Sequence, residues 1–226
     1  HSGSRNLGKQ VAEHYQKIAQ ASVSALPRTE IQEELISRLK ESGNAHLIQE
    51  ELSKLKPEEV HMDLAYLTGD SFWYYLNDMG IAQDFAYYNR EQILNNIEFG
   101  LGWKHVDEFQ TIHNYIDMDD MVLRKGAISA KNGERVLIPL NMRDGSIIAT
   151  GRGNKDWNNS APHGAGRILS RTKANETLDV GEFERQMSGI WTSCISQETL
   201  DESPMAYKPA GEIINAIDDC VNIISV

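Results

Sequence analysis

The chain has 226 residues and a mass of 25.4 kDa, with 40% hydrophobic and 24% charged residues, a composition typical of globular rather than disordered proteins. No stretch approaches the ~18 consecutive apolar residues of a transmembrane helix, and two cysteines are too few for a disulfide framework and suit a reducing, cytoplasmic setting. The net charge of −11 argues against a nucleic-acid partner, because domains that bind polyanions are usually basic.

The first hundred residues have the periodicity of amphipathic helices. Apolar residues recur at helical spacing from Leu7 to Ile18, directly after the opening His1-Ser2-Gly3-Ser4-Arg5. A loop that enters a helix in this way presents free backbone N–H groups, which can bind an anion. Further helices are expected over 31–39, ended by Gly43, over 47–57, ended by Pro57, and over 70–100, capped by Asp70 and closed by Gly100.

After Gly102 the sequence changes to short runs typical of strands. Asn132-Gly133 is a strong signal for a two-residue hairpin between two of them. The sequence therefore predicts an α+β fold in one compact unit, with a helical first half, a short-stranded sheet region and C-terminal helices. Strands are expected over 106–115, 121–124, 127–130, 135–138, 146–150 and 221–226, and later helices from Gly166 onward, over 183–187 and around 213–217.

Charge is distributed unevenly along the chain. Residues 1–121 carry 10 Lys and Arg against 20 Asp and Glu, and residues 176–226 carry 2 against 10. Residues 122–175 carry 10 against 3, a local balance of +7. Such a block is what a focused phosphate-binding region would show, although folding can also scatter these charges.

His163 lies in the segment Ser160–Arg167, which we expect to lead directly into a helix. Two glycines let the backbone approach a ligand closely, and Arg167 can fork onto a phosphate. His163 is therefore a candidate nucleophile, metal ligand or general base. The alternative is a loop histidine whose neighbours simply make a tight turn.

His113 and Asn114 lie in a strand-like run, where polar side chains need partners if they are buried. Metal ligation or substrate binding would supply partners, and so would an ordinary backbone contact in the core. The acidic residues 117–120 lack the spacing of a calcium loop, so we interpret them as a solvated turn. The cationic segments 124–125 and 170–171 are expected to be solvated faces. No P-loop, GxGxxG, HExxH or CxxC pattern is present in the sequence.

Several short segments form a recognisable pattern when they are taken in chain order. The chain contains HSGSR at 1–5, HN at 113–114, RKGA at 124–127, HGAGR at 163–167, SR at 170–171 and DESPMAYK at 201–208. Each is weak alone, but HGAGR followed by SR and a DExPxAYK segment is specific. Together they resemble the RtcB family of RNA-splicing ligases over nearly the whole chain, least distinctively in the helical region 30–100. Asn89-Arg90 also fits the resemblance.

The resemblance implies a GTP- and Mn²⁺-dependent RNA ligase, used in tRNA splicing or RNA repair. It would join RNA ends bearing a 3′-phosphate or 2′,3′-cyclic phosphate to 5′-hydroxyl ends, as a monomer without a membrane partner. His163 matches the nucleophile that forms a histidine–GMP phosphoramidate, and covalent transfer by imidazole is sound chemistry.

The resemblance also assigns binding residues. His1 and His113 match metal ligands of the family. The phosphate groups of RNA or triphosphate would contact Arg5, Lys125, Arg167 and Arg171. The guanylate pocket would comprise His113, Asn114, Pro139, Leu140, Asn141, Met142, Ser146, His163, Gly164, Ala165, Gly166 and Tyr207.

The sequence departs from the family pattern in several places. The DxGCG and GGGNH-like motifs do not occur, the chain ends at Val226 where the family usually has a lysine, and Pro139–Arg143 reads PLNMR instead of a Gly-rich loop. We therefore expect residues 1–226 to be the trimmed C-terminal portion of a single RtcB-like domain, without its N-terminal metal-binding part. The departures suggest a divergent paralogue, and the piece alone is expected to be inactive.

Two functions from other classes remain open. One is a relative that binds RNA or phosphate without ligating, and the other is a metal-dependent phosphoesterase that uses His1 and His113. Neither would form a guanylate adduct on His163.

Overall fold

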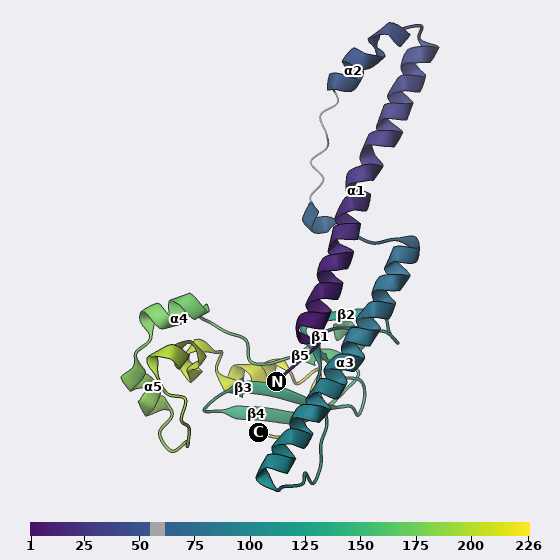
Figure 1. Cartoon of the computed structure of the whole chain (residues 1–226). Helices are drawn as coiled ribbons and strands as arrows, with labels where there is room; N and C mark the ends of the chain where they lie inside the picture. The colour runs from purple at the N-terminus through teal and green to yellow at the C-terminus, as the bar shows by residue number, and fades with distance from the viewer. Residues whose placement is uncertain (55–61) are drawn as a thin grey trace. The chain divides into compact units, whose positions relative to one another are not determined.

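The computed structural model describes the backbone of residues 1–54 and 62–226, and within these the side chains of all residues except 23–31. The chain divides into two compact units, residues 1–104 and 105–226, which are described separately (Figure 1). Helices come first, and strands and short helices follow, which confirms the α+β class. No helix within the described ranges is long and apolar enough to cross a membrane.

The first unit is built on two long helices, α1 (Arg5–Glu41) and α3 (Gly69–Leu101), which lie side by side (Figure 1). The Tyr15 hydroxyl on α1 donates a hydrogen bond of 2.7 Å to the Asp78 carboxylate on α3, and its ring packs against Tyr75. Small buried residues such as Ala19 and Ala82 allow close packing of the unit's helices. The shorter elements are η1 (Ala45–Leu47), α2 (Ile48–Lys54) and η2 (Met62–Leu64).

The helix boundaries differ from the prediction in three places. The helices expected around 7–18 and 31–39 are one continuous helix, α1, whose backbone stays helical through the intervening residues, Pro27 among them. Helix α3 begins at Gly69 after the N-cap Thr68, so Asp70 lies in its first turn and does not cap it. Helix α3 passes through Gly100 and ends at Leu101, and Gly102, with a φ of +65°, supplies the left-handed cap. Pro57, expected to end the third helix, lies outside the described residues.

The second unit contains two antiparallel three-stranded sheets. The first has the order β1 (His113–Asp117), β2 (Val122–Ser129), β5 (Ser160–Pro162), and the second has β3 (Arg135–Asn141), β4 (Gly145–Gly151), β6 (Val221–Ser225). The helical elements are η3 (Lys155–Trp157), α4 (Arg171–Thr177), α5 (Val180–Gln186), η4 (Gln197–Glu202), η5 (Pro204–Ala206) and α6 (Ala210–Ala216).

The main core of this unit lies where the two sheets and α6 present their apolar faces. Burial alternates along β3 and β4, so that Val136, Ile138 and Ile147 point inward and are at most 1% exposed. Each such side chain contributes about 1.5–3 kcal/mol of transfer free energy when buried. A second cluster forms around Phe183, Met187 and Leu200.

Four predictions about this unit are wrong. The strands expected over 121–124 and 127–130 are one strand, β2. Asn132-Gly133 does form a turn, with Gly133 at φ +79°, but it joins strands of different sheets and makes no hairpin. The hairpin joins β3 to β4. Residues 106–112 form no strand, because Arg135 binds the Asp107 carboxylate and the Glu108 carbonyl, and these side-chain bonds replace a ladder. No helix starts at Gly166, since α4 begins only at Arg171, capped by the Ser170 hydroxyl.

The core assignment predicts a large cost for truncating Ile138, which is 0% exposed. The Ile138→Ala variant should lose about 2–5 kcal/mol of unfolding free energy through lost transfer energy and a residual cavity. Leu123→Ala, at a strand residue that is 73% exposed, should change it by less than about 0.5 kcal/mol. Urea denaturation of the two variants checks this, and equal losses would contradict the core assignment.

Candidate functional site

His163 is exposed and follows β5 directly. Its ring nitrogen Nδ1 lies 2.7 Å from the backbone carbonyl oxygen of Gly126 on β2. A carbonyl oxygen can only accept a hydrogen bond, so this contact requires the proton on Nδ1. In the neutral ring, the other nitrogen, Nε2, then carries the lone pair.

A bulge in β2 aims the Gly126 carbonyl at His163. The β1–β2 register jumps from Tyr115↔Arg124 to His113↔Ile128, so three residues of β2 oppose one residue of β1. Gly126 has a φ of +68°, which glycine adopts without strain. Its N–H donates a hydrogen bond of 2.7 Å to Oδ1 of Asn114, which itself has a φ of +59°. Asn114 therefore holds the residue whose carbonyl orients His163.

His113 on β1 lies beside His163. The two ring centroids are 5.0 Å apart, with the planes tilted by 35°, and the His113 side chain is half-buried. Two imidazoles, one on β1 and one directly after β5, thus lie close together. The resemblance placed both residues in one site, and the fold brings them together.

The glycine loop after His163 lies against the end of β3. The N–H of Ala165 donates a hydrogen bond of 3.0 Å to the Pro139 carbonyl, and a Cβ on Gly164 would lie 3.1 Å from the same oxygen. Ser146 pairs with Pro139 in the β3–β4 ladder. The expected guanylate-pocket residues at 139, 146 and 163–166 therefore come from adjoining backbone segments.

Three other expected pocket residues have their side chains engaged elsewhere. Leu140 is 2% exposed in the main core, and Met142 packs against the Phe183 cluster. Asn141 accepts hydrogen bonds from the backbone of Arg143 and Asp144 and donates to the Asp144 carboxylate. Contacts from these residues to a ligand would have to come largely from the backbone.

The HGAGR and DESPMAYK segments are hydrogen-bonded to each other. The backbone N–H of Ile168 donates a hydrogen bond of 2.9 Å to the Ala206 carbonyl, and the backbone N–H of Lys208 donates one of 3.1 Å to the Gly166 carbonyl. Arg167 donates to the Leu169 carbonyl and the Tyr207 hydroxyl at 3.0 and 3.3 Å. Arg167 is therefore held as a clamp between the two segments.

Carboxylates partner the cations and the phenol around this clamp. Glu202 lies 3.5 Å from the Arg167 guanidinium and accepts a hydrogen bond from the Tyr207 hydroxyl. Burial, followed by this hydrogen bond and charge, raises the pKa of Tyr207 above its ordinary value. Arg171 pairs with Glu202 at 3.1 Å and with Asp201 at 3.6 Å, but its side chain is 74% exposed. Arg171 is thus better placed than Arg167 to meet an incoming phosphate.

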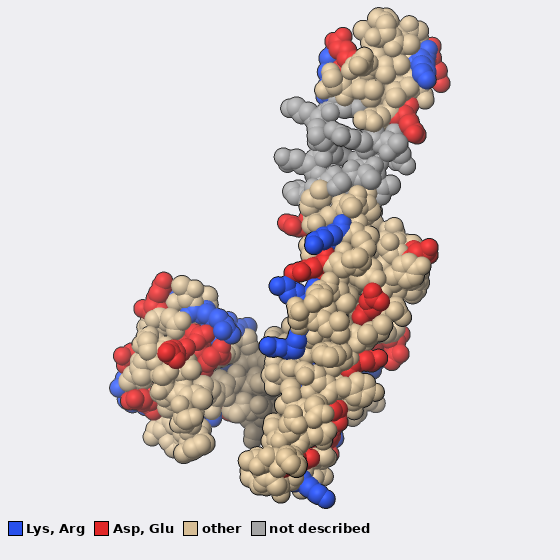
Figure 2. All heavy atoms as spheres, viewed as in Figure 1, with Lys and Arg blue, Asp and Glu red and all other residues tan. Residues whose placement is uncertain are grey.

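Internal ion pairs reduce the local charge of +7. Carboxylates pair with seven of the ten cationic residues in 122–175. On the lobe that carries α4 and α5, blue and red side chains alternate (Figure 2). The block therefore does not act as one concentrated patch. Lys125, which neighbours Gly126, is exposed.

The remaining predicted residues, His1 and Arg5, belong to the first unit. The opening segment is held on α3, where Asn89 donates to the Ser2 hydroxyl at 2.9 Å and to the Gly3 carbonyl at 3.2 Å. Arg90 donates to the Ser2 carbonyl at 3.3 Å. Asn89-Arg90, which fitted the resemblance without a role, therefore anchors the segment that carries His1.

The described residues fit a metal ion only in part. His113 offers an imidazole beside His163, but no cluster of three or more His, Cys, Asp or Glu occurs among the residues that the structure describes. A metal bound to protein groups usually needs about three or more such ligands. These residues do not form a complete site, and we derive no step through a metal.

Sequence reasoning missed Arg124, which was expected on a solvated face. It is 2% exposed and binds Asp117, which is also buried. The expected turn at 117–120 is present, but Asp117 is not solvated. The spacing of residues along β2 could have indicated that Arg124 is buried, because Arg124 lies on the same inward face of the strand as Ile128.

The geometry predicts that Gly126 controls the His163 tautomer. Gly126→Ala and Gly133→Ala both place a side chain at positive φ, at a similar strain of about 1–2 kcal/mol. Relief of that strain rotates the peptide, which moves the carbonyl away from Nδ1 only at residue 126. NMR of nitrogen-labelled histidine should show loss of the Nδ1-protonated form in Gly126→Ala alone. An equal effect in both variants, or in neither, would contradict the assignment.

The chain is similar to known proteins over nearly its whole length. The profile of the family "tRNA-splicing ligase RtcB" matches residues 1–225. RNA-splicing ligase RtcB of Escherichia coli (strain K12) is 31% identical over 244 residues, which cover 99% of this chain and 52% of that protein. tRNA-splicing ligase RtcB of Aeropyrum pernix is 26% identical over 252 residues, covering 94% of this chain and 46% of that protein. The chain thus spans about half the length of these relatives, and it belongs to the RtcB family.

Proposed function

We propose that the protein is an RNA ligase that joins 3′-phosphate or 2′,3′-cyclic phosphate ends to 5′-hydroxyl ends, through a GMP adduct on His163. The observation that carries the proposal is the contact of His163 Nδ1 with the Gly126 carbonyl. In the neutral ring this contact leaves the lone pair on Nε2, on an exposed side chain beside a glycine loop. The family and the names of the relatives, RNA- and tRNA-splicing ligases, support the reaction class.

In the first step, Nε2 of His163 attacks the α-phosphorus of GTP. A phosphorus–nitrogen bond forms, the bond to the oxygen that bridges the α- and β-phosphates breaks, and pyrophosphate leaves with the electron pair. The proton on Nδ1 stays hydrogen-bonded to the Gly126 carbonyl. Because that oxygen carries partial negative charge, it stabilises the positive charge that develops on the ring during attack.

In the later steps the RNA takes over the guanylate. A 2′,3′-cyclic end would first be opened by water, which bonds to phosphorus as the bond to O2′ breaks and leaves a 3′-phosphate and a 2′-hydroxyl. An oxygen of the RNA 3′-phosphate then attacks the guanylate phosphorus, the phosphorus–nitrogen bond breaks, and His163 regains its neutral ring. The 5′-hydroxyl then attacks the activated 3′-phosphate and GMP leaves. A histidine nucleophile divides one difficult phosphoryl transfer into easier steps.

The chain's cations have distinct roles in this proposal. Exposed Lys125 and Arg171 would contact RNA or triphosphate oxygens, together with Arg5 of the first unit. Arg167, which is bound to Tyr207 and Glu202, would instead hold the glycine loop in shape. We propose Mn²⁺ as the metal, to which His113 of the second unit would contribute an imidazole, and the Tyr207 ring as a guanine contact.

Replacement of the nucleophile tests the proposal. The intact natural protein, incubated with Mn²⁺ and GTP labelled at the α-phosphate, should acquire covalent label, and His163→Ala should acquire none. His46→Ala, at an exposed histidine of the first unit, serves as the control and should label normally. RNA binding should persist in His163→Ala, because the exposed cations remain.

The other functions give different outcomes in the same experiment. RNA binding without any label in the wild type would favour a non-ligating relative. Release of phosphate from RNA ends without GTP, sensitive to His113→Ala, would favour a phosphoesterase. Either outcome would overturn the ligase proposal.

A further inference from the structure

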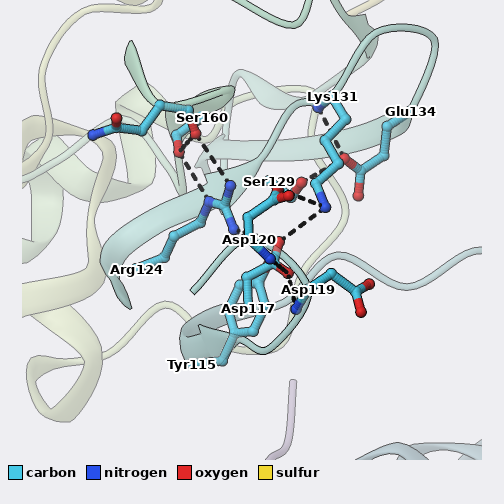
Figure 3. A network of polar contacts seen from close by, with 10 residues as sticks. Tyr115, Asp117, Asp119, Asp120, Arg124, Ser129, Lys131, Glu134 and Ser160 are labelled. Carbon is cyan, nitrogen blue, oxygen red and sulfur yellow. Dashed lines mark hydrogen bonds and ion pairs between the residues drawn. The ribbon is translucent and has the colours of Figure 1, made fainter. Parts of the chain in front are cut away.

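Arg124 is a buried cation at the centre of the sheet that carries His163. Its guanidinium donates hydrogen bonds to the Asp117 carboxylate at 2.9 Å, the Tyr115 hydroxyl at 3.1 Å and the Ser160 hydroxyl at 2.9 Å (Figure 3). It also donates to the Asn158 carbonyl at 3.2 Å. The guanidinium thus joins β1, β2 and the segment that enters β5.

The charge of Arg124 is compensated within this network. Asp117 pairs with Arg124 and with Lys131, which also reaches Asp120 (Figure 3). Burial alone would raise the pKa of Asp117, but the hydrogen bonds from Arg124 and Lys131 hold it below its ordinary value. A cation satisfied in this way has little capacity left for a phosphate. The role of Arg124 therefore depends on the segments that its hydrogen bonds hold in place.

Each anchored segment leads within a few residues to a group of the site. Tyr115 follows His113 by two residues, Gly126 follows Arg124 by two, and His163 follows Ser160 by three. The backbone ladder is weak at these points, because the β1–β2 register is broken by the bulge and the β2–β5 register has three pairs, one of them at Pro162. Proline has no N–H to donate. The side-chain hydrogen bonds of Arg124 therefore connect the three strands at the places where backbone hydrogen bonds between them are fewest.

We propose that Arg124 is a positioning residue for His163. By binding Tyr115, Asp117 and Ser160, it holds the three strands so that Nδ1 of His163 meets the Gly126 carbonyl. The inference rests on the proposed nucleophilic role of His163, but it concerns a geometry that exists without substrate. It therefore predicts an effect on the histidine as well as on the reaction.

A purely stabilising role is the alternative. A buried ion pair is weak evidence for net stability, because apolar residues of similar volume often replace it without loss. Stability and positioning can therefore be separated experimentally. The required readout is the His163 tautomer, which a general loss of stability leaves unchanged while the chain stays folded.

The experiment compares variants of the 226-residue chain. Arg124→Lys keeps the charge beside Asp117 but loses the fork that reaches Tyr115 and Ser160. Ser160→Ala keeps the ion pair and removes the anchor on β5, together with the hydrogen bond of 2.9 Å that the Ser160 hydroxyl donates to the Asn158 carbonyl. Asp179→Ala removes the N-cap of α5, which accepts a hydrogen bond from the Glu182 N–H, and controls for lost stability.

NMR of nitrogen-labelled histidine should show His163 predominantly Nδ1-protonated in the wild type and in Asp179→Ala. Arg124→Lys and Ser160→Ala should lose that preference. In the intact natural protein, the same two variants should form the GMP adduct more slowly at unchanged GTP affinity. The loss should be up to about 10²-fold, the cost of a misplacement of about 1 Å.

Two results would overturn the proposal. One is a wild-type tautomer in folded Arg124→Lys; if that variant does not fold, a wild-type tautomer in Ser160→Ala decides the same way. The other is an equal tautomer change in Asp179→Ala. A tautomer change in a protein that never takes up GMP would support the positioning role while it refutes the ligase, so the two claims fail separately.

Discussion

The account of the second unit depends on one hydrogen bond, which joins Nδ1 of His163 to the carbonyl oxygen of Gly126. A histidine that follows a short strand could otherwise adopt either tautomer and several ring orientations. The carbonyl selects the Nδ1-protonated tautomer, which in the neutral ring leaves the lone pair on Nε2, the atom that we propose as the nucleophile. The bulge in β2, the positive φ of Gly126 and the Asn114 side chain all serve to place that oxygen.

The surrounding motifs are connected through their contacts rather than through shared contact with a ligand. HGAGR and DESPMAYK bind each other through backbone hydrogen bonds and through the Arg167 clamp. RKGA supplies the buried anchor Arg124, the exposed Lys125 and the carbonyl of Gly126. A motif that looks like a cationic run in the sequence therefore contains three residues with different surroundings. Such a division explains why charge alone was a poor guide to the site.

Local patterns predicted much of the architecture. Amphipathic periodicity located α3 and the two ends of α1, while the functional role of His163, inferred from its sequence context, stays a prediction. The Asn132-Gly133 turn was predicted correctly, but the sheet to which each strand belongs depends on burial against distant strands and on α6, which no local pattern encodes. The solvated reading of Arg124 failed for the same reason. Its buried counter-charge, Asp117, becomes a partner only when β1 and β2 pair.

The central claim is that Nε2 of His163 is the reactive atom, and the most direct test locates the phosphorus on the ring. The intact natural protein, with nitrogen-labelled histidine, would be incubated with GTP and Mn²⁺ and its adduct examined by nitrogen–phosphorus NMR. The account predicts that the phosphorus is bonded to Nε2 of His163 and that Nδ1 retains its proton. A phosphorus on Nδ1, or on any other residue, would contradict it.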